Sequence, residues 1–186
     1  NDPVKYLKNK NLMEINSQKN DNSPKPNANL VKMDKSVCEI LQSLKDKNEN
    51  GIEFVIESSR FLNWTTHNSF ILIDDMSQFI TYDIKDNYLQ INFKSKLIEL
   101  YGYKINSSIN SFRYMRNWAL LGSTDRVKWI ILDEHCDDDS LQSNDSNIIT
   151  FSLYPQGIKL SSVKLIQTGK NNKSDDILAI RYFDLI

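Results

Sequence analysis

A short stretch near the middle of the chain, residues 117–132, constrains the fold most strongly. Two apolar runs, Trp118–Leu121 and Trp129–Leu132, flank the polar connection Gly122–Lys128. Glycine, serine and aspartate in that connection are turn formers, because glycine has free backbone angles and the other two bond their own backbone. The stretch therefore predicts a β-hairpin with a tryptophan at the start of each arm.

The two indoles of this hairpin alternate with aliphatic residues. On a strand, Trp118 and Leu120 point to one face, and Trp129 and Ile131 do the same on the next arm. Large aromatic side chains at this period are usually buried, so we expect both indoles in the core. A sugar-stacking platform made by the two rings is the alternative.

The rest of the chain from Gly51 onward has the pattern of an all-β protein. Short apolar runs with period two predict further strands at about 54–56, 70–73, 79–82, 88–93, 97–105, 148–153, 163–168 and 177–183. Polar connections are expected at 58–69, 106–117 and 133–146. Many short strands with few helices predict a β-sandwich.

The first 50 residues differ in composition from the remainder of the chain. Residues 1–28 are rich in Asn, Lys, Ser and Pro and too poor in apolar groups to offset the entropy of ordering, so they predict a flexible linker. Residues 29–50 predict an amphipathic helix, whose apolar positions are Leu30, Met33, Val37, Ile40, Leu41 and Leu44. We expect this short N-terminal helix to pack on the sandwich at 51–186, with presentation to a partner as the alternative.

Composition excludes several functions. The 186 residues have a net charge of −1, which gives no basic field for nucleic acid. No run of about 18 apolar residues is present, so we expect no membrane span. The two cysteines, Cys38 and Cys136, do not form a disulfide framework.

Three motifs, in order, carry a family resemblance. Residues 118–133 have the pattern Trp-x-x-x-Gly-Ser-x-Asp-x-x-x-Trp-x-x-Leu-Asp, residues 88–105 contain Tyr-Leu-Gln-Ile-Asn-Phe and Leu-Ile-Glu-Leu-Tyr-Gly-Tyr-Lys-Ile, and residues 163–185 contain Val-Lys-Leu-Ile-Gln-Thr-Gly-Lys-Asn. The chain from about Gly51 to Ile186 resembles the discoidin-like domains, also called the coagulation-factor type C family. The closest version is that of protist proteins.

The resemblance implies an all-β discoidin-like jelly-roll β-sandwich of the galactose-binding-like fold. Extracellular relatives often join the two ends of the domain by a disulfide. Cys136 lies in mid-domain and no cysteine lies near the C-terminus, so that link is absent here. A reducing compartment is therefore favoured, and we expect a cytoplasmic, intracellular location within a larger protein.

The predicted binding site lies in two loops. In discoidin-like relatives the first loop, here Ser58–Ser69, projects towards ligand, and loops at one end of a sandwich carry binding in many modules. The candidate ligand-binding residues are Arg60, Trp64, His67, Arg113 and Arg116. The alternatives are that Phe61 and Trp64 close the end of the sandwich, and that the two arginines of the second loop are solvated charges.

No metal and no cofactor are expected. Asp74, Asp75 and Thr81 resemble the calcium loop of carbohydrate-binding relatives, but Arg181 replaces the carboxylate that relatives supply from the last strand. The acidic run 133–139 is consecutive and lacks the spacing of metal ligands, so it predicts a solvated loop.

No catalytic constellation is present in the sequence. His135 and Cys136 are adjacent, so on a strand they point apart, and no phosphate loop or nucleophile elbow occurs. We therefore expect a non-catalytic binding module that recognises a protein partner through loops. A carbohydrate-binding module and a structural subunit of a large assembly are the alternatives.

Overall fold

The computed structural model describes residues 54–63, 79–94, 97–107, 112–142 and 148–186. The predicted linker and helix at 1–50 lie outside these residues and stay predictions. In the part of the chain that the structure describes, no helix is long and apolar enough to cross a membrane.

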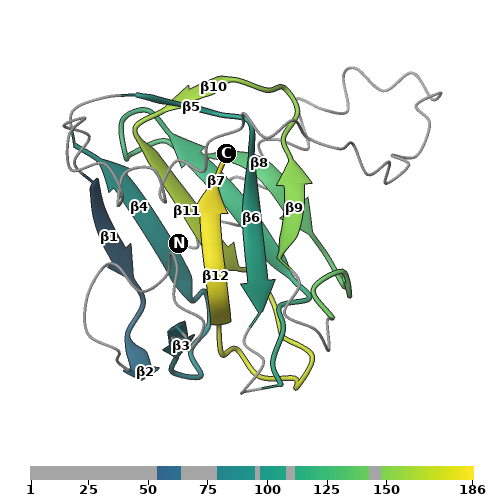
Figure 1. Ribbon diagram of the computed structural model, residues 1–186. Helices are drawn as coiled ribbons and strands as arrows, with labels where there is room; N and C mark the ends of the chain where they lie inside the picture. The colour runs from purple at the N-terminus through teal and green to yellow at the C-terminus, as the bar shows by residue number, and fades with distance from the viewer. Residues whose placement is uncertain (1–53, 64–78, 95–96, 108–111, 143–147) are drawn as a thin grey trace. The chain divides into compact units, whose positions relative to one another are not determined.

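Two five-stranded antiparallel sheets form the described domain (Figure 1). The first sheet has the order β1-β4-β11-β7-β8, with strands Phe54–Ser58, Tyr88–Phe93, Ser162–Gln167, Trp118–Ser123 and Ile130–His135. The second has the order β2-β3-β12-β6-β9, with strands Phe61–Asn63, Phe79–Thr81, Ala179–Leu185, Gly102–Ser107 and Ile149–Ser152. A ribbon of β5 (Ile98–Leu100) and β10 (Ile158–Leu160) lies at one end. This is the all-β sandwich that the sequence predicted.

The core arises from alternation along the central strands. On β4, Leu89 and Ile91 are only 1% exposed and belong to the hydrophobic cluster, while Gln90 lies between them on the other face of the sheet. The largest fully buried side chains come from both sheets: Trp118, Tyr103, Phe79, Phe93 and Phe183. Burial of these side chains between the two sheets supplies most of the stabilisation.

The hairpin is confirmed, but only one of its two indoles is in the core. Trp118 is fully buried, and its Nε1 donates to the Tyr103 hydroxyl at 3.1 Å. Trp129 precedes β8 and is half-buried, with the Lys164 ammonium 4.4 Å from its ring centroid. The expectation that Trp129 is a core residue is wrong. A register shift between Leu120 and Leu121 is the reason, because it brings Leu132 rather than Trp129 to the core.

Other strand boundaries differ in detail. The single strand expected at 97–105 is two strands, β5 and β6, separated at Tyr101. The backbone N–H of Tyr101 donates to Ile186 O at 2.6 Å, which ties this break to the C-terminus. The short strand β10 was not predicted, and β2 occupies part of the loop expected at 58–69. The run at 70–73 lies outside the described residues.

The acidic run 133–139 begins on a strand and not in the solvated loop that the sequence predicted. Strand β8 continues through His135, whose ring stacks on Trp118 with centroids 4.1 Å apart. His135 Nε2 lies 2.9 Å from Asp133 Oδ2, and Nδ1 lies 2.5 Å from Asp138 Oδ2. The Tyr103 hydroxyl donates to the same Asp133 oxygen at 2.8 Å. Asp133 and Asp138 are therefore partners of a histidine that packs against the core, whereas Glu134, Asp137 and Asp139 are exposed.

This arrangement shifts the pKa values of its members. Burial by itself lowers the pKa of His135, but the hydrogen bonds and charges of Asp133 and Asp138 outweigh it and raise the pKa above the usual 6.5. Burial raises the pKa of the two carboxyls, but hydrogen bonds from His135 and its neighbours outweigh that and hold both below the usual 3.8. Burial, followed by the Asp133 charge, raises the pKa of Tyr103.

We expect the two tryptophans to respond differently to truncation. Trp118→Ala should lower the free energy of unfolding by about 3–5 kcal/mol, because it empties a large site in the core. Trp129→Ala should cost about 1 kcal/mol, because its ring is only half-buried and lies outside the core, beside the Lys164 ammonium. Urea denaturation of both variants measures this, and equal losses would contradict the assignment of the two indoles.

The stability of the domain should fall on both sides of a mildly acidic optimum. His135 binds its proton more tightly folded than unfolded, so its contribution is complete below pH 6.5 and is lost as pH rises through its raised pKa. Asp133 and Asp138 contribute above pH 3.8, and that contribution is lost as pH falls through their lowered pKa values.

The free energy of unfolding measured from about pH 5 to about pH 9 checks the alkaline side. His135→Gln keeps a hydrogen-bonding side chain that does not titrate, so it should flatten the decline above pH 6.5. A parent protein whose stability rises with pH through this range would contradict the assignment.

Candidate functional site

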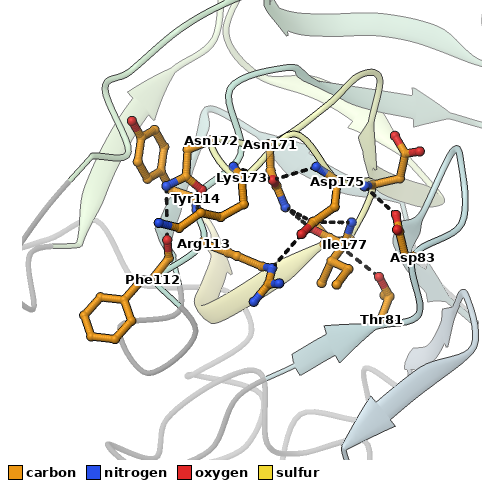
Figure 2. A network of polar contacts seen from close by, with 12 residues as sticks. Thr81, Asp83, Phe112, Arg113, Tyr114, Asn171, Asn172, Lys173, Asp175 and Ile177 are labelled. Carbon is orange, nitrogen blue, oxygen red and sulfur yellow. Dashed lines mark hydrogen bonds and ion pairs between the residues drawn. The ribbon is translucent and has the colours of Figure 1, made fainter.

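The loops at one end of the sandwich are joined to one another by side chains. These loops, 82–87, 112–117 and 168–178, meet where β4 and β7 begin and β11 ends, and we call this the loop end (Figure 1). Strand pairing places them together, since Tyr88 pairs with Ile166 and Trp118 with Gln167. Residues from all three loops carry the contacts drawn in Figure 2.

Asn171 and Asp175 fix the conformation of the last loop. The Asn171 side chain, 3% exposed, donates to Asp175 Oδ1 and to Ile177 O, and its Oδ1 accepts the Lys173 N–H at 2.8 Å. Asp175 Oδ2 accepts from Arg113 Nε at 3.0 Å, which connects this loop to the 112–117 loop (Figure 2). A buried asparagine with several backbone partners holds a loop in one shape.

Asn172 holds the 112–117 loop from its other side. Its Nδ2 donates to Phe112 O at 3.0 Å, and its Oδ1 accepts the Tyr114 N–H at 3.0 Å. Phe112 has a φ of 49°, a left-handed conformation that bulky residues rarely adopt, and its side chain is 75% exposed. The ring therefore projects from the loop end, and the two peptide groups that follow it, on either side of Arg113, are held by Asn172.

The 82–87 loop is attached to the last loop by Asn87 and Asp83. Asn87, 1% exposed, donates through Nδ2 to Tyr82 O, Ile84 O and Asp176 O at 2.7–2.8 Å. Asp83 Oδ1 accepts the Asp176 N–H at 2.7 Å. The three loops consequently form one preorganised surface.

Two of the predicted site residues, Arg60 and Arg113, lie at this surface. Arg60 is exposed, and its guanidinium carbon lies 4.8 Å from the Tyr82 ring centroid. Arg113 is partly exposed and is oriented by Asp175. Arg113 therefore lies on one of the three joined loops, whereas Arg60 lies in the β1–β2 connection, whose Arg60 O accepts the Tyr82 N–H at 3.2 Å beside the 82–87 loop.

Arg116 is placed differently. Its Nε donates to Asp139 Oδ1 at 2.7 Å, and its Nη1 lies 3.7 Å from Asp137. The hydrogen bond with Asp139, followed by the charge of that carboxylate, raises the pKa of Arg116. Arg116 thus binds the acidic segment that follows β8, and its guanidinium does not pair with Asp175 as that of Arg113 does.

Trp64 and His67 lie outside the described residues, so their role stays a prediction. Phe112 and the 171–176 loop were not predicted. The signal for Phe112 was its position next to Arg113 in a polar loop, and the signal for the second was the turn-forming run Asn-Asn-Lys-Ser-Asp-Asp.

Of the three weak calcium candidates, only Thr81 lies among the described residues. Asp74 and Asp75 lie outside the described residues. Thr81 is fully buried, and its hydroxyl accepts the Leu178 N–H at 2.9 Å. Among the described residues no group of three or more His, Cys, Asp or Glu side chains could hold a metal ion.

Cys136, whose position argued against the terminal link of extracellular relatives, is an exposed free thiol.

Comparison with known proteins gives structural likeness without sequence matches. No family model matches the sequence. A search of curated proteins gives no match either. Among solved structures, a family 32 carbohydrate-binding module from a family 31 glycoside hydrolase of Clostridium perfringens has a TM-score of 0.57 and 18% identity, over 72% of this chain and 93% of that one.

Two further structures are similar to the same degree. The family 32 module of C. perfringens NanJ, in complex with galactose, has a TM-score of 0.54 and 10% identity, over 71% of this chain and 92% of that one. A pectin-binding module has a TM-score of 0.55 and 15% identity, over 72% and 91%. These likenesses show that the chain has the discoidin-like, galactose-binding-like β-sandwich fold that its motifs predicted.

Proposed function

We propose that this chain is a non-catalytic carbohydrate-binding module that binds a neutral sugar at its loop end. The sequence favoured a protein partner and kept a carbohydrate as the alternative. The structural neighbours support the alternative. Two of them are in complex with galactose and with GalNAc-β-1,3-galactose.

The exposed ring of Phe112 is the observation that carries the proposal. An aromatic ring that is 75% exposed is accessible to a ligand, and covering its apolar surface is favourable. The left-handed backbone at this residue adds strain, and strained residues gather at binding sites. A flat apolar ring on a rigid loop suits the C–H face of a pyranose.

Polar groups around the ring supply what a sugar also needs. Arg113 is oriented by Asp175 and can donate to ring hydroxyls. Arg60 lies over Tyr82 on the adjoining loop and offers a second set of donors. A few fixed donors beside an aromatic surface is the usual composition of a small-ligand site.

The described histidine does not suit catalysis. Both ring nitrogens of His135 are engaged by carboxylates, so the ring cannot act as a general base for a ligand. The comparison with the C. perfringens glycoside hydrolase concerns its binding module, not its catalytic part. We therefore propose that the chain binds a glycan and does not catalyse a reaction on it.

Phe112→Ala should weaken galactose binding by about tenfold or more, because a stacking ring contributes roughly 1.5 kcal/mol or more. Isothermal titration with galactose and GalNAc-β-1,3-galactose measures the effect. Tyr154→Ala is the matched control, since Tyr154 is 94% exposed but lies next to the β5–β10 ribbon, away from the loop end. Equal affinity in the parent and Phe112→Ala would reject this site. If no neutral glycan binds and a protein binds in a way that depends on Phe112, the protein-partner alternative would be favoured instead.

Asn172→Ala tests whether the loop must be preorganised. The change removes the side-chain bonds to Phe112 O and Tyr114 N, and should lower the free energy of unfolding by about 1–2 kcal/mol. Galactose affinity should fall although no ligand contact is removed, because the loop must then be ordered on binding. Hydrogen exchange at the Tyr114 amide should accelerate. Unchanged exchange there would show that Asn172 does not hold this loop.

A further inference from the structure

A second concave surface lies at the opposite end of the sandwich. It is a groove of about 440 Å³ lined by Phe93, Lys94, Leu97, Thr124, Asp125, Arg126 and Ser161. Phe93 ends β4 and Ser123 ends β7, whereas the loop end is where these strands begin. Six residues of strand separate the two ends, which is about 20 Å. A single sugar residue in the groove therefore cannot also contact Phe112.

The turn that forms one wall of the groove is fixed by its own side chains. The Ser123 hydroxyl accepts the Arg126 N–H at 2.8 Å, and Asp125 Oδ1 accepts the N–H groups of Val127 and Lys128 at 2.8 and 2.7 Å. These backbone hydrogen bonds, from Lys128 and then Val127, lower the pKa of Asp125, so it stays ionised. The wall is a rigid element and not a loose loop.

Arg126 occupies a position that favours glycine. Its φ is 62°, in the left-handed region, where a side chain with a Cβ is strained. Its Nη2 donates to Phe93 O at 2.9 Å, which orients the guanidinium along the groove. Its other guanidinium N–H groups make no hydrogen bond to any residue that the structure describes. An arginine with a strained backbone and an oriented guanidinium, whose remaining N–H groups are available as donors, favours a ligand at this place.

The groove combines groups of four kinds. The Arg126 fork matches a carboxylate, to which it can donate two parallel hydrogen bonds. Asp125 Oδ2 and the Thr124 hydroxyl make no hydrogen bond within the described residues, so they can bind hydroxyl groups. Leu97, 53% exposed, offers an apolar side. Arg126 and Lys94 favour an anionic group and Asp125 favours hydroxyl donors, so a ligand with both a carboxylate and hydroxyls suits the charges that line the groove.

We propose that this groove is a second glycan site that binds an acidic sugar, a uronic acid residue of an oligosaccharide. Its carboxylate pairs with Arg126, its hydroxyls bond Asp125 and Thr124, and one C–H face lies on Leu97. The site does not depend on the neutral-sugar site at Phe112. Two sites at opposite ends of one sandwich can hold two chains, or two parts of one chain, at once.

The test uses the full chain and three probes: trigalacturonate, the neutral trisaccharide of galactose, and sulfate. Amide chemical shifts are followed by NMR. Trigalacturonate should move the signals of Thr124, Arg126 and Ser161. Neutral trisaccharide and sulfate should move them at concentrations about tenfold higher or not at all. Equal response to sulfate, or unmoved groove signals, would overturn the proposal. A glutamate-rich peptide that binds more tightly than trigalacturonate would also overturn it.

Arg126→Gly is the decisive variant, because glycine suits a φ of 62° and the change should not unfold the domain. It should weaken trigalacturonate binding about tenfold or more while galactose binding stays as in the parent. Arg126→Lys keeps the positive charge but loses the planar guanidinium, so it should weaken trigalacturonate binding by a smaller factor. If the Arg126→Gly variant melts many degrees lower than the parent, trigalacturonate affinity is measured instead on Thr124→Val, a substitution at an exposed residue. Unchanged trigalacturonate affinity in the variant used, or loss of this binding in Phe112→Ala, would overturn the groove as the site.

Discussion

The hydrogen bond from the Trp118 indole to the Tyr103 hydroxyl is the contact on which the rest of the sandwich depends. It joins β7 of one sheet to β6 of the other inside the core, where a missing partner would leave an indole N–H unsatisfied. The same hydroxyl donates to Asp133, and Asp133 engages His135, which stacks on the indole. Through these contacts the Trp118–Tyr103 pair holds part of the acidic segment against the core. The same pair fixes the start of β7, which lies at the loop end.

The fold could be predicted because the strand period and the turn chemistry agree along most of the chain. Strand β4, Tyr88–Phe93, has the expected bounds, since alternation of Leu89 and Ile91 with Gln90 leaves only one apolar face. The facing of Trp129 could not be predicted. One extra residue in β8 changes the register at Leu121, and a bulge leaves no mark in a short apolar run. The position of His135 could not be predicted either. A run of charged residues suggests a solvated loop, and it does not show that His135 pairs with Asp133 and stacks on Trp118.

The sequence could indicate on which segments the candidate site residues lie, but not which contacts they make. Arg60 and Arg113 do lie on adjoining loops, as the position of their segments suggested. Arg116 is three residues from Arg113, yet it pairs with Asp139 whereas Arg113 pairs with Asp175. Phe112 was missed since exposure of an aromatic ring in a loop depends on a left-handed φ, which the hydrogen bonds of Asn172, sixty residues away in sequence, maintain.

Non-glycine residues in the left-handed region mark both ends of the sandwich. Phe112 stands at the loop end and Arg126 at the groove, and each is held by side-chain contacts across the chain, to Asn172 in one case and to Phe93 O in the other. A domain that needed only stability would place glycine at such positions and remove the strain. Asp86, Asp137 and Ser174 are left-handed as well, but at Phe112 and Arg126 the position carries an exposed ring and an oriented guanidinium, groups that serve a ligand better than a core. The rigid strands between them keep the two surfaces about 20 Å apart, so a glycan can occupy either one without altering the other.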